Sequence, residues 1–169
     1  MLKIKRNFIP NLLSRLRELQ KSQGSIGYYN EQGNHSTAGL RYVDLFGIQS
    51  FGSTKVKIPP RPVLDLTFDF YNPLSKNMTL KRDLKLYLSN IKSKTPRIKA
   101  EQILENVLGD YVEKVRSYFG DPTKIESNSA FTQWLKEKNG LEPNSPLVWS
   151  GELRDNLSYK INGQPIVTP

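Results

Sequence analysis

The chain contains no cysteine and only one histidine among its 169 residues. Without cysteine the protein can form no disulfide bond or thiolate metal site, and it has no cysteine nucleophile. A serine hydrolase needs a histidine beside its serine, but His35 lies in a polar segment and no glycine-flanked serine elbow is present. The glycines match neither a Walker nor a dinucleotide-binding pattern. We therefore expect no enzymatic activity, no cofactor and no metal.

Long apolar runs are missing as well. The basic start, residues 1–6, is not followed by the roughly 7 to 15 apolar residues of a signal peptide. No segment approaches the roughly 18 consecutive apolar residues of a membrane-spanning helix. Together with the lack of cysteine, these features favour a protein that is made in a reducing cytoplasm and is not inserted into a membrane.

Positive charge exceeds negative charge, and it is unevenly distributed. The net charge is +9. Residues 1–99 contain 18 Lys and Arg against 6 Asp and Glu, or +12, whereas residues 100–169 contain 7 against 10, or −3. This asymmetry is compatible with nucleic-acid contact by the basic part or with head-to-tail docking of subunits. A solvated basic surface without a partner is the third alternative.

Apolar residues recur at helical or strand spacing along most of the chain. The sequence predicts helices over residues 9–21, from Thr37 to just before Gly52, and over residues 62–71, 80–91, 98–119 and 131–137, with strands over residues 25–29 and 157–161. The segment 98–119 has the broadest apolar stripe and is expected to be the central core helix. We therefore predict one α+β domain over residues 1–169, with several helices packed on a small, mostly antiparallel sheet. Residues 1–8 and 162–169 are expected to be flexible arms.

Two pairs of carboxylates are spaced four residues apart in predicted helices: Asp65 with Asp69, and Glu101 with Glu105. Each pair can share one helical face and hold a magnesium ion, as in a nuclease. Such pairs are also common on solvated helix faces, and the sequence favours that explanation.

Two separated motifs resemble the virion-morphogenesis and minor tail protein family of tailed phages. In the first, over residues 42–64, a predicted helix ends in an aromatic residue and glycine, and an isoleucine-proline-x-arginine-proline segment follows. In the second, over residues 145–159, a proline-leucine pair precedes glycine, leucine and arginine and then a predicted strand. The positions that carry the resemblance and are candidates for a ring contact are Phe51, Gly52, Ile58, Pro59, Arg61, Pro62, Gly151, Leu153 and Arg154.

The resemblance implies a structural neck or tail-completion protein that helps to join the DNA-filled head to the tail. It also implies a ring of subunits, expected to be a hexamer, around the DNA channel of the virion. The implied partners are head-completion or connector proteins and tail-terminator or tail-tube proteins, with non-specific contact to DNA. The alternatives are a tail-terminator protein that caps the tail tube and a basic DNA-binding accessory protein.

The motif residues also have a purely structural interpretation. Gly52 can end a helix with a positive φ, and the prolines that flank Arg61 impose a rigid extended connection. In that interpretation Phe51 and Ile58 belong to the core, and Arg61 pairs with Asp65 one turn further on. The functional alternative makes the connection 52–62 part of a subunit contact, because a preformed edge loses little entropy on docking.

Overall fold

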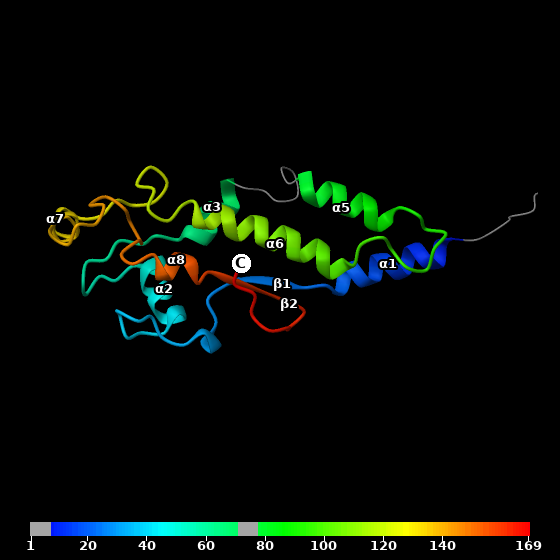
Figure 1. Ribbon diagram of the computed structural model, residues 1–169, viewed down its shortest axis with the longest axis horizontal. Coiled ribbons are helices and arrows are strands. Elements are labelled where there is room, and N and C mark those ends of the chain that lie inside the picture. Colours follow the sequence, from blue (N-terminus) through cyan, green and yellow to red (C-terminus); the bar gives the residue numbers. More distant parts are fainter. Residues whose placement is uncertain (1–7, 71–77) are drawn as a thin grey trace, which may run out of the picture.

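The long helix α6, Ala100–Arg116, lies along the middle of the molecule, and the other elements are arranged around it (Figure 1). A computed structural model describes residues 8–70 and 78–169 of the chain. Helix α6 is shorter than the predicted segment 98–119, because the chain leaves the helix after Arg116 in a turn. Tyr118 and Phe119 lie in that turn and remain buried, so the apolar stripe continues into the core beyond the end of the helix.

A small antiparallel sheet packs against α6. Strand β1, Gly24–Gly27, pairs with β2, Ser158–Ile161, so that the two strands connect distant parts of the sequence. Both strands contact α6. The predicted strands are confirmed in position, although β1 ends two residues before the expected Tyr29. The described residues form seven α-helices and this sheet, which confirms the predicted α+β domain.

The segment 162–169 returns along β2. Val167 and Tyr159 exchange two backbone hydrogen bonds of 2.9 Å, and Arg116 donates a hydrogen bond to the carbonyl oxygen of Pro169. The structure therefore places this segment against the domain, where a flexible arm was expected. Residues 1–7 of the other expected arm lie outside the described residues.

One end of the elongated molecule is formed by α1, Ile9–Lys21, and α5, Met78–Leu88 (Figure 1). The predicted helix over residues 9–21 is confirmed. Its most buried residue is not a leucine but Arg15, which is 2% exposed. Arg15 donates to the carbonyl oxygens of Tyr87, Ser89 and Ser93 at 2.7, 2.7 and 2.9 Å. These bonds satisfy carbonyl groups at and beyond the end of α5, where the helix itself offers no donors.

Much of the apolar stripe of α1 faces solvent. Ile9, Leu13 and Leu16 are exposed, and they follow one another at helical spacing of four and three residues. A smaller apolar cluster beneath α1 and α5 contains Leu80, Tyr87, Ala100 and Ile103.

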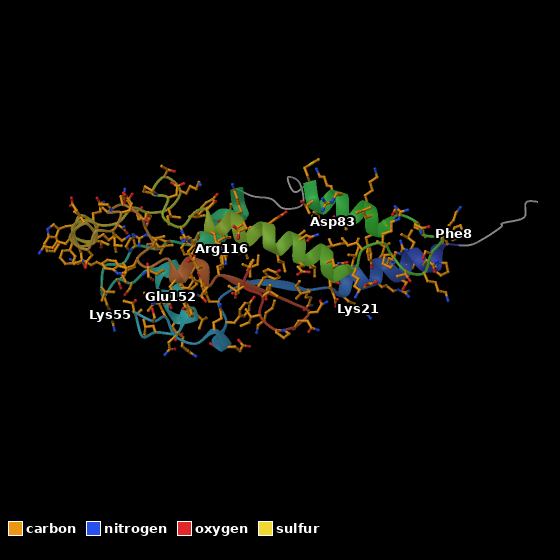
Figure 2. The ribbon with its side chains drawn as sticks, viewed as in Figure 1. Phe8, Lys21, Lys55, Asp83, Arg116 and Glu152 are labelled. Carbon is orange, nitrogen blue, oxygen red and sulfur yellow. The ribbon has the colours of Figure 1, made fainter. Side chains whose placement is uncertain are left out.

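The opposite end contains α2, Tyr42–Phe51, α3, Val63–Phe70, α7, Ala130–Lys138, and the short α8, Glu152–Asp155. A 3-10 turn, Asn30–Gln32, precedes them. In Figure 2, Phe8 lies near one end of the long axis and Lys55 lies in the opposite half of the molecule. The main core lies between this end, α6 and the sheet, and it is rich in tyrosine. Among the described residues, none of the helices has the length and apolarity that crossing a membrane requires.

The prediction that Thr37 caps the second helix is wrong. The backbone amides of Thr37 and Ala38 instead donate to Nδ1 of His35, at 3.3 and 3.2 Å, and hold the chain in turns. Helix α2 begins only at Tyr42, after Arg41 in extended conformation. The predicted end of this helix at Gly52 is confirmed.

Candidate interaction pocket

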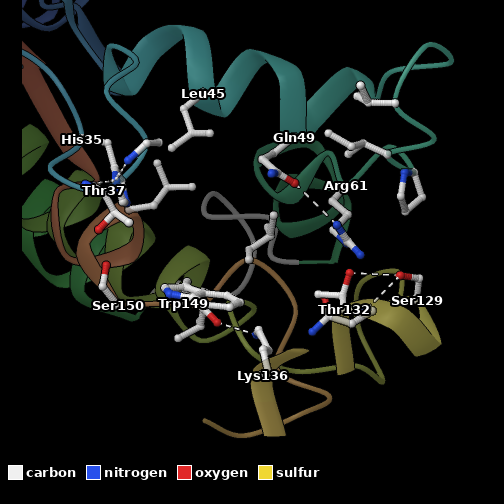
Figure 3. Close-up of a pocket in the computed structure, with 18 of the residues that line it drawn as sticks. His35, Thr37, Leu45, Gln49, Arg61, Ser129, Thr132, Lys136, Trp149 and Ser150 are labelled. Atoms are coloured by element: carbon white, nitrogen blue, oxygen red, sulfur yellow. Dashed lines mark hydrogen bonds between the residues drawn. The ribbon is translucent and has the colours of Figure 1, made fainter. Parts of the chain in front are cut away.

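The two motif segments, about ninety residues apart in the sequence, line one pocket of about 670 Å³ (Figure 3). Its walls come from residues 35–38, α2, the connection 52–62, residues 128–136 in and before α7, and the segment 145–153. Five of the nine candidate residues line it: Ile58, Pro59, Arg61, Gly151 and Leu153. Phe51 and Gly52 border a neighbouring hollow that shares Ile58 and Pro59 with the pocket. Pro62 and Arg154 line neither cavity.

The connection 52–62, which forms part of the pocket wall, begins where Gly52 ends α2. Gly52 has φ 73° and ψ −178°, a conformation that is available almost only to glycine. A Cβ atom at this position would lie 2.7 Å from the carbonyl oxygen of Ile58 and 2.9 Å from the amide nitrogen of Pro60. Ser53 and Ile58 then exchange two backbone hydrogen bonds of 2.9 Å, which close the loop 53–58. Gly52 therefore permits the tight return that brings Ile58 and Pro59 to the pocket wall.

Arg61 connects this loop to the segment before α7. Its side chain is 6% exposed, and it donates to the carbonyl oxygens of Glu126 at 2.7 Å and Ser127 at 3.0 Å. A longer contact of 3.5 Å joins it to Oε1 of Gln49. Burial lowers the pKa of Arg61, and the nearby charge of Glu126 acts in the opposite direction. The predicted pairing of Arg61 with Asp65 is wrong, because the guanidinium group points to backbone carbonyl groups on another segment.

Lys136, on α7, is the second buried cation at the pocket. The sequence alone did not indicate it. Its side chain is 3% exposed, and its ammonium group donates to the carbonyl oxygens of Ser145 and Val148. Burial lowers the pKa of Lys136, and the positive charge of Arg61 acts in the same direction. A lysine in a short helix is usually solvated, so no local sequence pattern distinguishes this one.

All of the formally charged residues that line the pocket are basic. They are Lys57, Arg61 and Lys136, and no aspartate or glutamate joins them in the lining. The carboxylates that influence the pKa values of the two buried cations belong to Glu126 and Glu142, and neither lines the pocket. Among the described residues, neither Arg61 nor Lys136 has a carboxylate oxygen within ion-pair distance. The pocket is therefore positively charged.

Apolar side chains at the pocket are exposed to solvent. Val56, Phe131 and Trp149 all line it and all are exposed. The expectation that Phe51 belongs to the core is wrong, since it is 86% exposed. Ile58 is half-buried in the pocket wall. This end of the molecule thus combines apolar surface with buried positive charge.

Glu152 fixes the second motif segment to the loop before α2. Its carboxylate accepts hydrogen bonds from the amide of Ser36 at 2.9 Å and from the hydroxyl groups of Ser36 and Tyr42. The side chain of His35 lies 3.8 Å away. The hydrogen bonds from Ser36 and Tyr42 lower the pKa of Glu152 to about 2. Of the neighbouring motif residues, Leu153 is buried in the core, and Arg154 forms a surface pair with Asp155.

In the part of the chain that the structure describes, no third candidate ligand joins either pair of carboxylates. Asp65, Asp69, Glu101 and Glu105 are all exposed. Within residues 8–70 and 78–169, no cluster of three or more His, Asp or Glu side chains is arranged to hold a metal ion.

Comparisons of the chain with protein-family models, with curated proteins and with solved structures find no match.

Proposed function

We propose that the protein is a structural component of a tailed-phage virion, located in the neck or at the upper end of the tail, that joins the tail to the DNA-filled head. The observation that supports this most is the convergence of the two motif segments on a single pocket. Five of the nine residues that carry the resemblance line this pocket, although they come from segments far apart in the sequence, and a common contact would require such convergence. The protein acts by shape, without turning over a substrate.

The distribution of apolar surface supports assembly by unlike contacts. The exposed face of α1 lies at one end of the long axis, and the pocket with its exposed aromatic side chains lies at the other. Because these surfaces differ, a contact of the pocket with another copy joins two unlike surfaces, and such head-to-tail contacts close into a ring when the rotation between subunits permits it. We propose a hexameric ring whose partners are head-completion or connector proteins on one side and tail-terminator or tail-tube proteins on the other. The protein is made in the host cytoplasm and ends in the virion.

A phage in which the gene is inactivated tests this role. Filled heads and complete but unattached tails should accumulate, and electron microscopy of lysates should show both. Adding the purified protein to such a lysate should restore joined particles. Normal virions from the inactivated phage would contradict the proposal.

A second candidate function is that of a basic DNA-binding accessory protein, and one observation favours it. Residues 81–99 contain seven Lys and Arg against a single acidic residue, Asp83. Asp83 is buried and binds Arg82 and Asn106, so the exposed charge of this stretch is positive. This candidate predicts binding to duplex DNA that weakens steeply with salt. Gel-shift titrations at low and at physiological salt test it, and no binding at low salt would exclude it.

A further inference from the structure

Helix α3 displays an exposed aromatic side chain flanked by two carboxylates. Phe68 is 61% exposed, and its ring makes an edge contact with Tyr111 at a centroid distance of 6.4 Å. Asp65 and Asp69 are exposed, and neither forms an ion pair with another described residue. Spacings of three and four residues place all three side chains on one face of the helix. This face is acidic and apolar.

The pocket has the complementary character. Its charged lining residues are Lys57, Arg61 and Lys136, and its rim is apolar. A volume of about 670 Å³ is ample for one phenylalanine side chain. Lys57 is exposed at the mouth, so a carboxylate can reach it without any rearrangement of the fold. The hydrogen bonds from Arg61 to Glu126, Ser127 and Gln49 do not use every N–H of its guanidinium group, so it too can donate to a further anionic partner.

We propose that the α3 face of one copy docks into the pocket of the next copy, with Phe68 inserted among the apolar side chains and Asp65 and Asp69 facing the basic residues. This contact rests on the self-association proposed above and specifies which surfaces meet. The pairing of an aromatic anchor with charges at its sides is typical of subunit contacts in which apolar burial supplies affinity and charge supplies orientation.

The α3 face cannot fill the pocket of its own chain. The helix starts just after Arg61 and packs against α6, where the hydroxyl group of Tyr111 donates to the carbonyl oxygen of Leu64 at 2.8 Å. The exposed face of α1 is a poorer occupant, because the one carboxylate of α1, Glu18, already accepts a hydrogen bond from Tyr87, and Arg17 beside it is exposed. The acidic face of α3 is therefore the better match to a basic pocket.

Charge exchange between Lys57 and Asp69 tests the contact. Lys57→Glu and Asp69→Lys each place like charges across it, and both positions are exposed, so the fold should be retained. We expect each single variant to self-associate at least about tenfold more weakly than the unmodified protein, as measured by sedimentation velocity across a concentration series. Phe68→Ala should weaken association at least as much, because it removes the apolar anchor.

A mixture of the two single variants gives the sharpest result. In an equimolar mixture, every contact between unlike variants pairs opposite charges, whereas contacts between like variants remain repulsive. Native mass spectrometry should therefore show alternating assemblies that contain both variants, at concentrations at which each variant alone assembles only weakly. The double variant Lys57→Glu/Asp69→Lys should likewise regain self-association. Lys55→Glu is the matched control on the same loop, because Lys55 does not line the pocket, and it should associate normally.

The failures of the two proposals can be separated. If the unmodified protein self-associates and the single variants do so equally well, the α3 contact is wrong and the ring proposal stands. If the unmodified protein stays monomeric at every concentration, both this contact and a self-sufficient ring are contradicted. If Lys57→Glu alone abolishes binding to another virion protein and Asp69→Lys does not, the pocket belongs to that protein and the α3 contact is overturned.

Discussion

At the scale of single residues, two buried basic side chains organise the pocket. Arg61 and Lys136 each hold two backbone carbonyl groups that belong to irregular segments. Such carbonyl groups have no partner in a helix or sheet, and a buried carbonyl group without a hydrogen bond destabilises the fold. A buried cation that binds them therefore satisfies these groups and fixes the segments in place. The motif made Arg61 a candidate, but its partners could not be read from the sequence. Those partners lie more than sixty residues away, and the nearby Asp65 was the more obvious choice.

We predict that Arg61→Lys destabilises the protein. Lysine cannot reproduce the planar arrangement of donors that reaches Glu126 and Ser127, and it leaves buried carbonyl groups unsatisfied. The free energy of unfolding should fall by about 2 kcal/mol in urea titrations. Arg41→Lys is the control, since Arg41 pairs with Asp44 on the exposed surface and should cost less than about 1 kcal/mol. Equal effects of the two substitutions would contradict the structural role assigned to Arg61.

Glu152 gives a prediction on pH. Its pKa is about 2 in the folded protein, below its ordinary value of 4.5, so the folded state favours the charged carboxylate. The stability that Glu152 contributes is therefore fully present above about pH 4.5 and is lost as the pH falls toward 2. Unfolding titrations over this range should show a flatter pH dependence for Glu152→Gln than for the unmodified protein. Parallel curves would show that the hydrogen bonds from Ser36 and Tyr42 do not hold the charge.

At the scale of elements, the sequence predicted the helices and strands better than it predicted the irregular segments between them. The positions of α1, α5 and α6 follow from apolar spacing, and those of α3, α7 and both strands from short residue patterns with their flanking proline, glycine and polar residues; the ends differ by a few residues. The start of α2 did not follow, because a histidine ring nitrogen holds the preceding turn and no sequence rule places it there. The four-residue α8 was missed for a simpler reason, since it is too short to show a helical period. The pocket was out of reach because it depends on how irregular segments meet.

The turn at Gly52 provides a prediction at this scale. Gly52 and Gly33 share an unusual backbone conformation, with φ 73° and ψ −178° at Gly52 and φ 78° and ψ −148° at Gly33. An added Cβ clashes with the Ile58 carbonyl group at Gly52, but meets nothing within 4 Å at Gly33. Gly33→Ala should therefore cost about 1 to 3 kcal/mol for backbone strain, and Gly52→Ala distinctly more. Chemical denaturation gives the free energy of unfolding of both variants, and the difference between them is the cost of the steric clash at Gly52. Equal losses of stability would contradict the packing described for the loop 53–58.

At the scale of the whole molecule, the chain has unlike ends. The apolar face of α1 is uncovered at one end, whereas the other end has the basic pocket and exposed aromatic side chains. The charge asymmetry along the sequence does not separate these ends, because Lys57 and Arg61 from the basic part meet Lys136 from the acidic part in one pocket. Net charge by segment was therefore a poor guide to the local charge of the surface.

The central claim is that copies of this chain form a ring at the head–tail junction, and electron cryo-microscopy of the intact virion neck tests it most directly. The account predicts a closed ring of density at the junction into which the described domain fits, with the pocket of each copy facing its neighbour. A neck reconstruction in which no layer accommodates this domain, from virions shown by mass spectrometry to lack the protein, would contradict it.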